Sequence, residues 1–184
     1  MKVFKFGGAS VKDAAGVKNL SSIVHQQHGQ LIVVVSAMGK TTNLLETLCN
    51  AYFHQDPKAT AIMKELKDFH LNIVNSLFPL NDPVYKHLEE LFTNLENILA
   101  SESSLCYDYE YDRIICFGEL ISTTIISDYL KMEGIENQFI DIRKFLKTDQ
   151  NYRNANIDLE LSEQLCKEAF DFKASSTFVT QGFI

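Results

Sequence analysis

The chain has 184 residues, of which 46% are hydrophobic and 22% charged, as in an ordinary globular domain rather than a disordered segment. Seventeen Lys and Arg residues against 24 Asp and Glu give a net charge of −7, which argues against a general nucleic-acid binder or a membrane-surface protein. The longest unbroken apolar run, residues 31–35, is far shorter than the roughly 20 residues of a membrane span. The first five residues show no signal-peptide pattern, so we expect a cytoplasmic protein.

The first segment of the chain predicts a strand, a glycine turn and a helix. Val3, Phe4 and Phe6 form a short apolar segment that Gly7 and Gly8 end. Beyond Ser10, apolar residues recur every three or four positions, which is the spacing of an amphipathic helix. Ser10 and Asp13 together resemble a capping box, so we expect this helix to begin at Ser10.

The next segments predict a second strand and three helices. The run 31–35 is continuously apolar, which is typical of a strand covered on both faces. A loop of small residues, 36–43, leads from it into a helix. Two further apolar patterns, at 59–77 and 84–99, keep helical spacing and predict an antiparallel helical hairpin.

The last part of the chain continues the alternation of helices and strands. Residues 111–130 predict one long helix, apolar around most of its circumference and therefore buried, which Gly134 ends. Residues 138–142 predict a strand, 159–170 a helix and 177–184 a final strand. This alternation predicts an α/β sandwich without an internal domain boundary. Because the final strand stays apolar to its last residue, we expect the chain to be a piece of a longer protein.

The first glycine turn has the features of an anion site. In α/β folds, ligands bind beyond the carboxyl ends of the strands. Lys5 places a positive charge there, and Gly7 and Gly8 allow the backbone amides to approach a ligand closely. A helix beginning at Ser10 would direct the positive end of its dipole to the same place. The alternative is a tight turn with a solvated lysine, and the local pattern leaves both interpretations open.

The second loop carries a group of hydroxyl side chains. Residues 39–41 resemble the end of a P-loop, but Val34 occupies the place of the motif's first glycine, so a P-loop NTPase is not expected. The hydroxyl groups of Ser36, Thr41 and Thr42 are suited to hydrogen-bonding a small polar ligand. Alternatively, Thr41 or Thr42 caps the helix that follows.

Glu119 lies in the middle of the most apolar predicted helix. An ionised carboxylate in that environment must be paired or shifted in pKa, so we expect a cationic partner. Both a ligand and a lysine or arginine of the protein remain open as that partner. Gly118 before it costs the helix about 1 kcal/mol relative to alanine, which indicates close approach by another backbone or a ligand.

The cysteines and histidines do not form a recognisable site. Four cysteines are widely spaced without a CxxC pair, so we expect reduced cysteines in packing roles. The five histidines show no metal-ligand or catalytic spacing, and we expect surface or packing roles. No metal-binding residue is predicted among Cys49, Cys106, Cys116, Cys166, His25, His28, His54, His70 and His87.

Five short motifs, in order along the whole chain, resemble the aspartokinase branch of the amino acid kinase family. They are KFGGASV at 5–11, VSAMGKTTNLL at 35–45, GELIS at 118–122, DIR at 141–143 with TD at 148–149, and QGFI at 181–184. Each motif is weak alone, but their order makes the resemblance specific.

The resemblance implies a three-layer αβα sandwich of the amino acid kinase (carbamate kinase-like) type. It also implies ATP-dependent phosphorylation of the side-chain carboxylate of L-aspartate, giving 4-phospho-L-aspartate on the way to lysine, threonine and methionine. ATP and Mg²⁺ are then expected as cofactors. By the same resemblance, the phosphates of ATP are bound by Lys5, Gly7, Gly8 and Ser10, and Lys5 is also the catalytic residue. The amino acid is bound by Ser36, Thr42 and Glu119.

The chain departs from the family pattern in two ways. Ala9 stands where the family has threonine, and the family's Arg-Gly-Gly-Ser-Asp segment is absent from the sequence. We therefore expect 1–184 to be the amino-terminal, substrate-binding lobe, without the nucleotide-binding lobe and ACT domains, and inactive alone. A full-length parent is expected to be a homo-oligomer. Glutamate 5-kinase or acetylglutamate kinase is the nearest alternative enzyme, and a non-catalytic amino-acid-binding or regulatory module derived from the same lobe is the alternative from another class.

Overall fold

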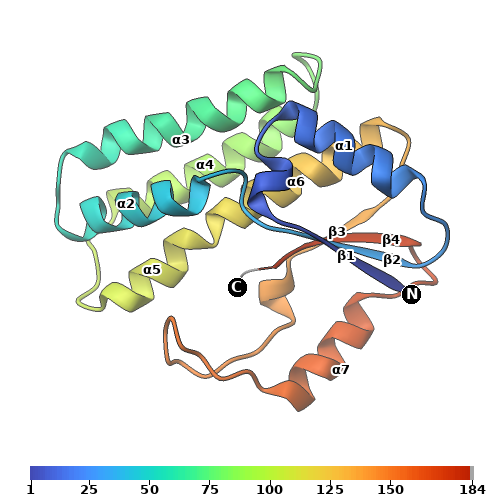
Figure 1. The fold of residues 1–184 in the computed structure, drawn as a ribbon. Helices are drawn as coiled ribbons and strands as arrows, with labels where there is room; N and C mark the ends of the chain where they lie inside the picture. The colour runs from blue at the N-terminus through green and yellow to red at the C-terminus, as the bar shows by residue number, and fades with distance from the viewer. Residues whose placement is uncertain (183–184) are drawn as a thin grey trace.

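A computed structural model describes residues 1–182 of the chain (Figure 1). Its four strands form one sheet in the order β1-β2-β4-β3, and every neighbouring pair is parallel. The strands are β1 (Lys2–Phe6), β2 (Leu31–Val35), β3 (Gln138–Ile140) and β4 (Thr177–Gln181). The parallel sheet confirms the α/β fold expected from the alternating pattern.

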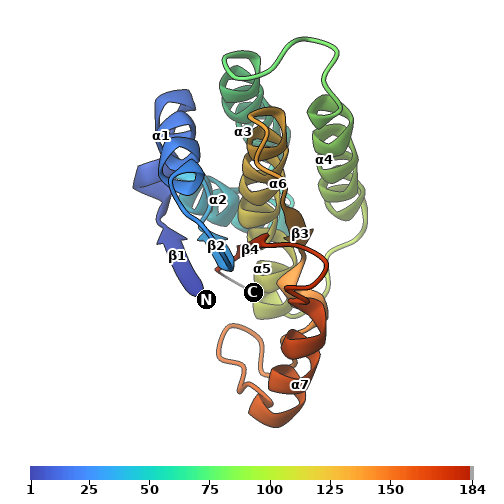
Figure 2. The same cartoon turned by 90° about the vertical axis from the view of Figure 1, so that its right-hand side faces the viewer.

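The helices cover the two faces of the sheet unequally. Figures 1 and 2 show α6 and α1 over one face, α2 to α5 extending that layer outward, and α7 on the opposite side. This arrangement is the expected three-layer αβα sandwich, with α7 as the helix of the third layer. The helices are α1 (Ala14–His25), α2 (Thr41–Phe53), α3 (Lys58–Asn75), α4 (Val84–Ala100), α5 (Tyr107–Ile115), α6 (Phe117–Met132) and α7 (Leu159–Ala169).

Aromatic rings complete the packing on the α7 side of the sheet. Phe178 of β4 is fully buried, and the rings of Phe170 and Phe172 pack edge-on against it at centroid distances of 5.4 and 5.1 Å. The turn after α7 thus covers the central strands on this face. Edge-to-face pairs of this kind add to the free energy gained from burying the rings.

Helix α6 is the centre of the core, as its apolar sequence predicts. Twelve of its sixteen residues are buried, so it is covered by the sheet below and by other helices above. The expectation of one continuous helix over 111–130 was wrong, because the helical segment is divided at Cys116 into α5 and α6. Helix α5 packs on α2, whereas α6 packs on the sheet. The break at Cys116 allows the two helices to point in different directions and pack against these different elements. Gly134, at φ 78°, ends the segment as expected.

The expected hairpin of α3 and α4 is present. Lys67 of α3 pairs with Glu96 of α4 at 2.6 Å, and its ammonium group lies 5.5 Å from the centre of the Phe92 ring. Figure 1 shows the two helices running next to each other, and the segment that joins them contains Pro79 and Pro83. No helix in the described part of the chain is both long and apolar enough to cross a membrane.

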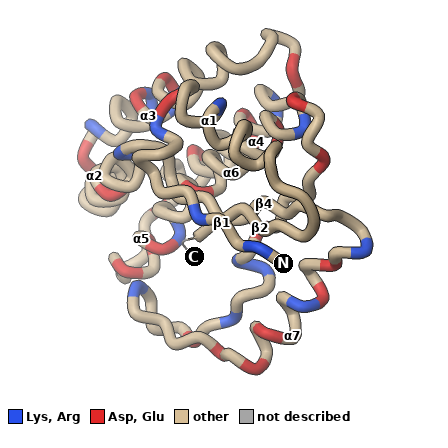
Figure 3. Tube along the Cα trace, turned by 45° about the vertical axis from the view of Figure 1, so that its right-hand side comes forward, with Lys and Arg blue, Asp and Glu red and all other residues tan. Residues whose placement is uncertain are grey.

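Charges of both signs are mixed on the outer helices. Figure 3 shows Lys and Arg interspersed with Asp and Glu along α3, α5 and α7. The negative net charge is therefore not gathered in one acidic block on these helices.

Helix α1 begins later than the sequence pattern predicts. Residues Gly8–Val11 form a 3₁₀ turn, and the side chain of Asp13, not that of Ser10, caps the helix by accepting a hydrogen bond from Gly16 N at 2.8 Å. Val11 is fully buried, so the 3₁₀ turn folds back onto the core before the helix starts. The expected capping box at Ser10 was therefore wrong.

The cap assignment predicts a stability difference between two neighbouring substitutions. We expect Asp13→Ala to lower the free energy of unfolding by about 1 kcal/mol, because the N–H group of Gly16 loses its acceptor. Ser10→Ala, the matched control, is expected to change it by less than about 0.5 kcal/mol. Urea unfolding of both variants measures the difference, and equal losses would contradict the assignment of the cap to Asp13.

Candidate functional site

The carboxyl ends of all four strands meet at one edge of the sheet. Phe6 pairs with Val35, Val35 with Gln181, and Ile140 with Thr180. The loops after the strands therefore leave from the same edge, where parallel α/β sheets bind their ligands. The candidate site lies at this edge.

The first two loops are joined by their backbones. Ser36 N donates a hydrogen bond to Phe6 O, and Gly39 N donates one to Gly8 O, each at 3.0 Å. A methyl group on the α-carbon of Gly8 would lie 2.4 Å from the carbonyl oxygen of Ala37, so glycine is required there by close approach. Gly7, by contrast, faces open space.

The first loop offers donors for an anion. Lys5 is exposed near the carboxyl end of β1, just before the two glycines. Among the described residues, the N–H groups of Gly8 and Ala9 have no hydrogen-bond acceptor. A cation and free amides at a strand end suit a phosphate group. The dipole of a helix starting at Ser10 is not part of this loop, because α1 starts one turn later, at Ala14.

The hydroxyl side chains of the second loop have different roles. Thr41 is buried and its hydroxyl donates to Met38 O at 2.6 Å, so it closes the turn that enters α2. Ser36 and Thr42 make no side-chain hydrogen bond within the described residues, and Thr42 is exposed. Lys40 occupies the cap position of α2 without capping it by its side chain. Of the predicted hydroxyl cluster, Ser36 and Thr42 remain available to a ligand.

Glu119 sits where α6 passes the end of β4. It is 6% exposed, and its Oε2 accepts a hydrogen bond from Gly182 N at 2.7 Å. A methyl group on Gly118 would lie 3.0 Å from both Ala37 Cβ and Leu45 Cδ1. Gly118 is therefore closely approached, but by side chains and not by the backbone or ligand that was expected. The contact holds α6 against the second loop and the start of α2.

Lys5 and Glu119 converge at Gly182. A methyl group on the α-carbon of Gly182 would lie 3.9 Å from Lys5 Cε, 3.9 Å from Glu119 Oε2 and 3.1 Å from Val34 Cγ1. The structure therefore brings the predicted cation and the predicted acid to one point at the carboxyl edge. The remaining predicted residues lie in the two adjoining loops: Gly7, Gly8 and Ser10 in the first, and Ser36 and Thr42 in the second.

A polar network beside Glu119 fixes the end of β3, a role that the sequence did not reveal. Asp141 accepts hydrogen bonds from Arg143 Nη2 at 2.7 Å and Gln181 Nε2 at 3.1 Å, and Gln181 Oε1 accepts one from Ile142 N. Burial alone would raise the pKa of Asp141, but the hydrogen bonds and charge of Arg143 outweigh it and hold that pKa below its usual value. Asp141 begins a 3₁₀ turn here, so β3 ends at Ile140 and not at 142 as expected.

The Arg143 side chain also reaches the junction of α5 and α6. Its Nη1 lies 3.4 Å from the sulfur of Cys116. Burial raises the pKa of the Cys116 thiol, and the nearby guanidinium opposes that rise. All four cysteines are free thiols, but Cys106 is exposed, so the expected packing role does not hold for it.

The segment after β3 is held against α5 by one arginine. Arg153 N donates to Asp112 at 2.8 Å, its Nη1 donates to Asp108 at 3.1 Å, and its guanidinium lies 4.3 Å from the centre of the Tyr111 ring. Arg153 has φ 61°, a left-handed conformation uncommon for residues with a side chain. These contacts hold the segment that contains Arg153 against α5, and sequence spacing alone could not indicate them.

His70 is a buried neighbour of the second loop. Its Nδ1 donates to Leu66 O at 2.8 Å, since a carbonyl oxygen only accepts, and its Nε2 lies 3.4 Å from Thr41 Oγ1. Burial lowers the pKa of His70 to about 4, although the bond to Leu66 opposes this. The expected packing role of His70 is confirmed, and it packs directly behind the turn that Thr41 closes.

The depressed pKa of His70 predicts a loss of stability in acid. The unfolded chain binds the proton with a pKa near 6.5, so stability is complete above that value and is lost as the pH falls toward 4. Between pH 7 and pH 5 we expect the free energy of unfolding to fall by about 2 kcal/mol more in wild type than in His70→Gln. Urea unfolding at both pH values measures this. His28→Gln, an exposed control, should keep the wild-type difference, and an equal fall in His70→Gln would contradict the prediction.

The fold and the site define a class of protein: an α/β sandwich with an exposed lysine, free backbone amides and a buried acid at the carboxyl edge of its parallel sheet. The family model described as the amino acid kinase family matches residues 1–184, and the chain belongs to that family. The resemblance found in the sequence motifs is thereby confirmed.

Within this family, the curated relatives and solved structures that resemble the chain are aspartokinases. The chain is 26% identical over 185 residues to lysine-sensitive aspartokinase 3 of Escherichia coli, covering 99% of this chain and 40% of that protein. It is 30% identical over 164 residues to the chloroplastic aspartokinase 2 of Arabidopsis thaliana, covering 84% of this chain and 29% of that protein. The Escherichia coli aspartokinase III structure with aspartate and ADP superposes with a TM-score of 0.87 at 25% identity, covering 99% of this chain and 40% of that one. The chain therefore spans 40% or less of the length of these relatives.

Proposed function

We propose that the chain is the amino-acid-binding lobe of an ATP-dependent aspartate kinase. The single observation that carries the proposal is the convergence of Lys5 and Glu119 at Gly182, beside two loops with free donors. A cation and an acid at one point suit a reaction between a phosphate and a zwitterionic amino acid. The solved relative contains aspartate and ADP together, which supports this pair of ligands.

In the proposed reaction the side-chain carboxylate of L-aspartate attacks the γ-phosphorus of ATP. A carboxylate-to-phosphorus bond forms, the bond from the γ-phosphorus to the bridging oxygen breaks, and ADP leaves with that electron pair. The nucleophile is already ionised, so no general base is required. Phosphoryl transfer depends mainly on positioning and on neutralising charge. Lys5 performs that neutralisation, and the amides of Gly8 and Ala9 hold the phosphate oxygens.

The aspartate is held from the other side. Glu119 accepts hydrogen bonds from the α-ammonium group, and the hydroxyls of Ser36 and Thr42 bond the polar end of the substrate. The carboxylate of Glu119 is kept in place by Gly182 N, so it is oriented before the ligand arrives. Orientation in advance lowers the entropy lost on binding.

The donor set fits ATP phosphates better than a directly bound metal ion. The groups that approach Gly182 are the side chain of Lys5 and the carboxylate of Glu119, and the carboxylate of Asp141 nearby is already bonded to Arg143 and Gln181. In many kinases Mg²⁺ is held largely by phosphate oxygens and water, with one or two carboxylates. We expect Mg²⁺ to arrive with ATP, where it neutralises charge on the phosphates.

The wider context follows from the same proposal. Residues 1–184 form the substrate lobe, and the nucleotide-binding lobe and ACT domains come from sequence beyond it. The complete protein is cytoplasmic, forms a homo-oligomer and takes the first step toward lysine, threonine and methionine.

The test is trapping of the acyl phosphate as a hydroxamate. We expect the product of the complete reading frame to form it from L-aspartate, MgATP and hydroxylamine, with L-glutamate and N-acetyl-L-glutamate at least about tenfold slower. The 184-residue chain alone is expected to form little or none. Rapid hydroxamate formation by the short chain would contradict the lobe assignment. No activity from the complete protein would contradict the kinase proposal and favour a non-catalytic amino-acid-binding module.

A further inference from the structure

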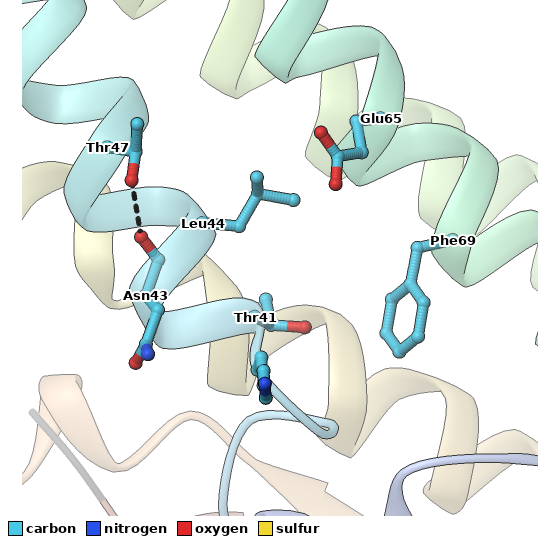
Figure 4. Close-up of a pocket in the computed structure, with 7 residues that line it drawn as sticks. Thr41, Asn43, Leu44, Thr47, Glu65 and Phe69 are labelled. Atoms are coloured by element: carbon cyan, nitrogen blue, oxygen red, sulfur yellow. Dashed lines mark hydrogen bonds between the residues drawn. The ribbon is translucent and has the colours of Figure 1, made fainter.

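A second concave site lies between α2 and α3, apart from the Lys5–Glu119 cluster. It has a volume of about 300 Å³ and is bounded by the start of α2 and the middle of α3 (Figure 4). That volume is at the lower end for small-molecule sites, which suits a ligand of amino-acid size rather than a nucleotide. We call it the α2–α3 groove, and Lys40, Asn43, Leu44, Glu65 and Phe69 are among its lining residues.

The walls of the groove are apolar and fixed. Figure 4 shows Leu44 of α2 and Phe69 of α3 projecting toward the same space, and both side chains are half-buried. The Phe69 ring packs edge-on against His70 at 4.9 Å, and its Cζ would lie 3.5 Å from a methyl group on Gly39. A side chain held on both sides in this way offers a preformed apolar surface.

Opposite charges border these walls. Lys40 lies at the start of α2, and Glu65 lies one turn before Phe69 on the same face of α3. Within the described residues, neither Lys40 nor Glu65 forms an ion pair. By contrast, Lys64 and Lys67, which lie close to Glu65 on α3, are paired with carboxylates. The groove therefore presents one cation and one anion that the protein itself leaves unused.

The start of α2 adds donors next to Lys40. Within the described residues, the N–H groups of Thr42 and Asn43 have no hydrogen-bond acceptor, as expected in a first helical turn. Lys40, these amides and the helix dipole together favour a carboxylate at this end. Glu65, on the α3 side of the groove, favours an ammonium group.

We propose that the α2–α3 groove binds a free α-amino acid with an apolar side chain. The carboxylate of the ligand lies at Lys40 and the start of α2, its ammonium group at Glu65, and its side chain between Leu44 and Phe69. The inference does not rest on the proposed kinase activity, because none of these five contacts involves Lys5 or Glu119. An occupant would touch the second loop at Lys40, two residues before Thr42.

The experiment titrates the 184-residue chain with L-leucine and follows binding by calorimetry and by amide chemical shifts. We expect saturable binding, with shift changes at Leu44 and Phe69. Leucinamide, which lacks the carboxylate, and N-acetyl-L-leucine, which lacks the ammonium group, are expected to bind at least about tenfold more weakly. No binding of L-leucine up to about 10 mM would overturn the proposal.

Single substitutions test whether the charges of Lys40 and Glu65 contribute to binding more than other charges on the same surface do. Lys40→Gln and Glu65→Gln are each expected to raise the Kd for L-leucine at least about tenfold. Lys64→Gln is the matched control, one residue from Glu65 but paired with Asp68, and should leave the Kd unchanged. An unchanged Kd in both groove variants would overturn the proposal. Lys5→Ala should retain L-leucine binding, so failure of the kinase proposal and failure of this one give different results.

Discussion

Lys5→Ala is expected to lower kcat by about 10²- to 10³-fold in the complete protein, if assayed as the aspartate kinase we propose, with little change in stability. The lysine is the cation at the carboxyl edge, where charge develops on the transferring phosphoryl group in the proposed reaction. Its side chain is exposed, so truncation leaves no cavity in the core. Steady-state hydroxamate formation measures kcat, and urea unfolding measures stability.

The control for Lys5 lies on the same strand. Lys2 is exposed at the other end of β1, where its Nζ donates to Gln27 Oε1 at 2.9 Å. Lys2→Ala removes the same charge from the chain but from the edge opposite the site, and should leave kcat within about twofold. A near-normal kcat in Lys5→Ala, or equal losses in the two variants, would contradict the role given to Lys5.

The sheet could be predicted from sequence because its strands carry a short-range signal. The run 31–35 is apolar throughout, and in the structure it pairs on both sides as β2. The glycine turn after β1 and the loop after β2 could both be assigned to the carboxyl ends of strands, where α/β folds bind their ligands. Strand order could not be read in the same way, because it depends on contacts between distant segments.

The helix boundaries depended on packing that periodicity does not encode. Asp13 caps α1 in place of Ser10 because Val11 is drawn into the core and the chain makes a 3₁₀ turn first. A methyl group on Gly16 would lie 2.4 Å from the carbonyl oxygen of Ser10, so this turn fits only against a glycine. The division at Cys116 likewise follows from two helices that pack on different neighbours.

The supporting residues of the site were the hardest to predict. Arg153 binds the carboxylates of Asp108 and Asp112, which lie more than 40 residues away in the sequence. Arg143 binds Asp141 two residues before it, but its contact with Cys116 spans 27 residues. His70 is 29 residues from Thr41 and gains its depressed pKa from burial, which a sequence pattern does not measure. Glu119 could be singled out only because a lone acid in an apolar helix needs a compensating partner.

Gly8→Ala is expected to lower the free energy of unfolding by about 3 kcal/mol. The added methyl group would lie 2.4 Å from the carbonyl oxygen of Ala37 and 3.2 Å from that of Gly39. Both neighbours are backbone atoms, so neither can rotate away as the end of a side chain could. The first two loops would have to separate, which would also break the hydrogen bond from Gly39 N to Gly8 O. The midpoint of urea unfolding measures the loss, provided that the m-value is unchanged.

Gly7→Ala is the matched control, and it separates a steric requirement from a general need for glycine in this turn. Gly7 has φ −74°, which alanine adopts without strain, and an added methyl group would meet no atom within 4 Å. We therefore expect its free energy of unfolding to stay within about 0.5 kcal/mol of wild type, or to rise slightly because the unfolded chain loses entropy. Equal destabilisation by the two substitutions would mean that chain flexibility, and not the contact between Gly8 and Ala37, sets the requirement. A loss confined to Gly8→Ala would establish that this contact holds the loop after β1 against the loop after β2.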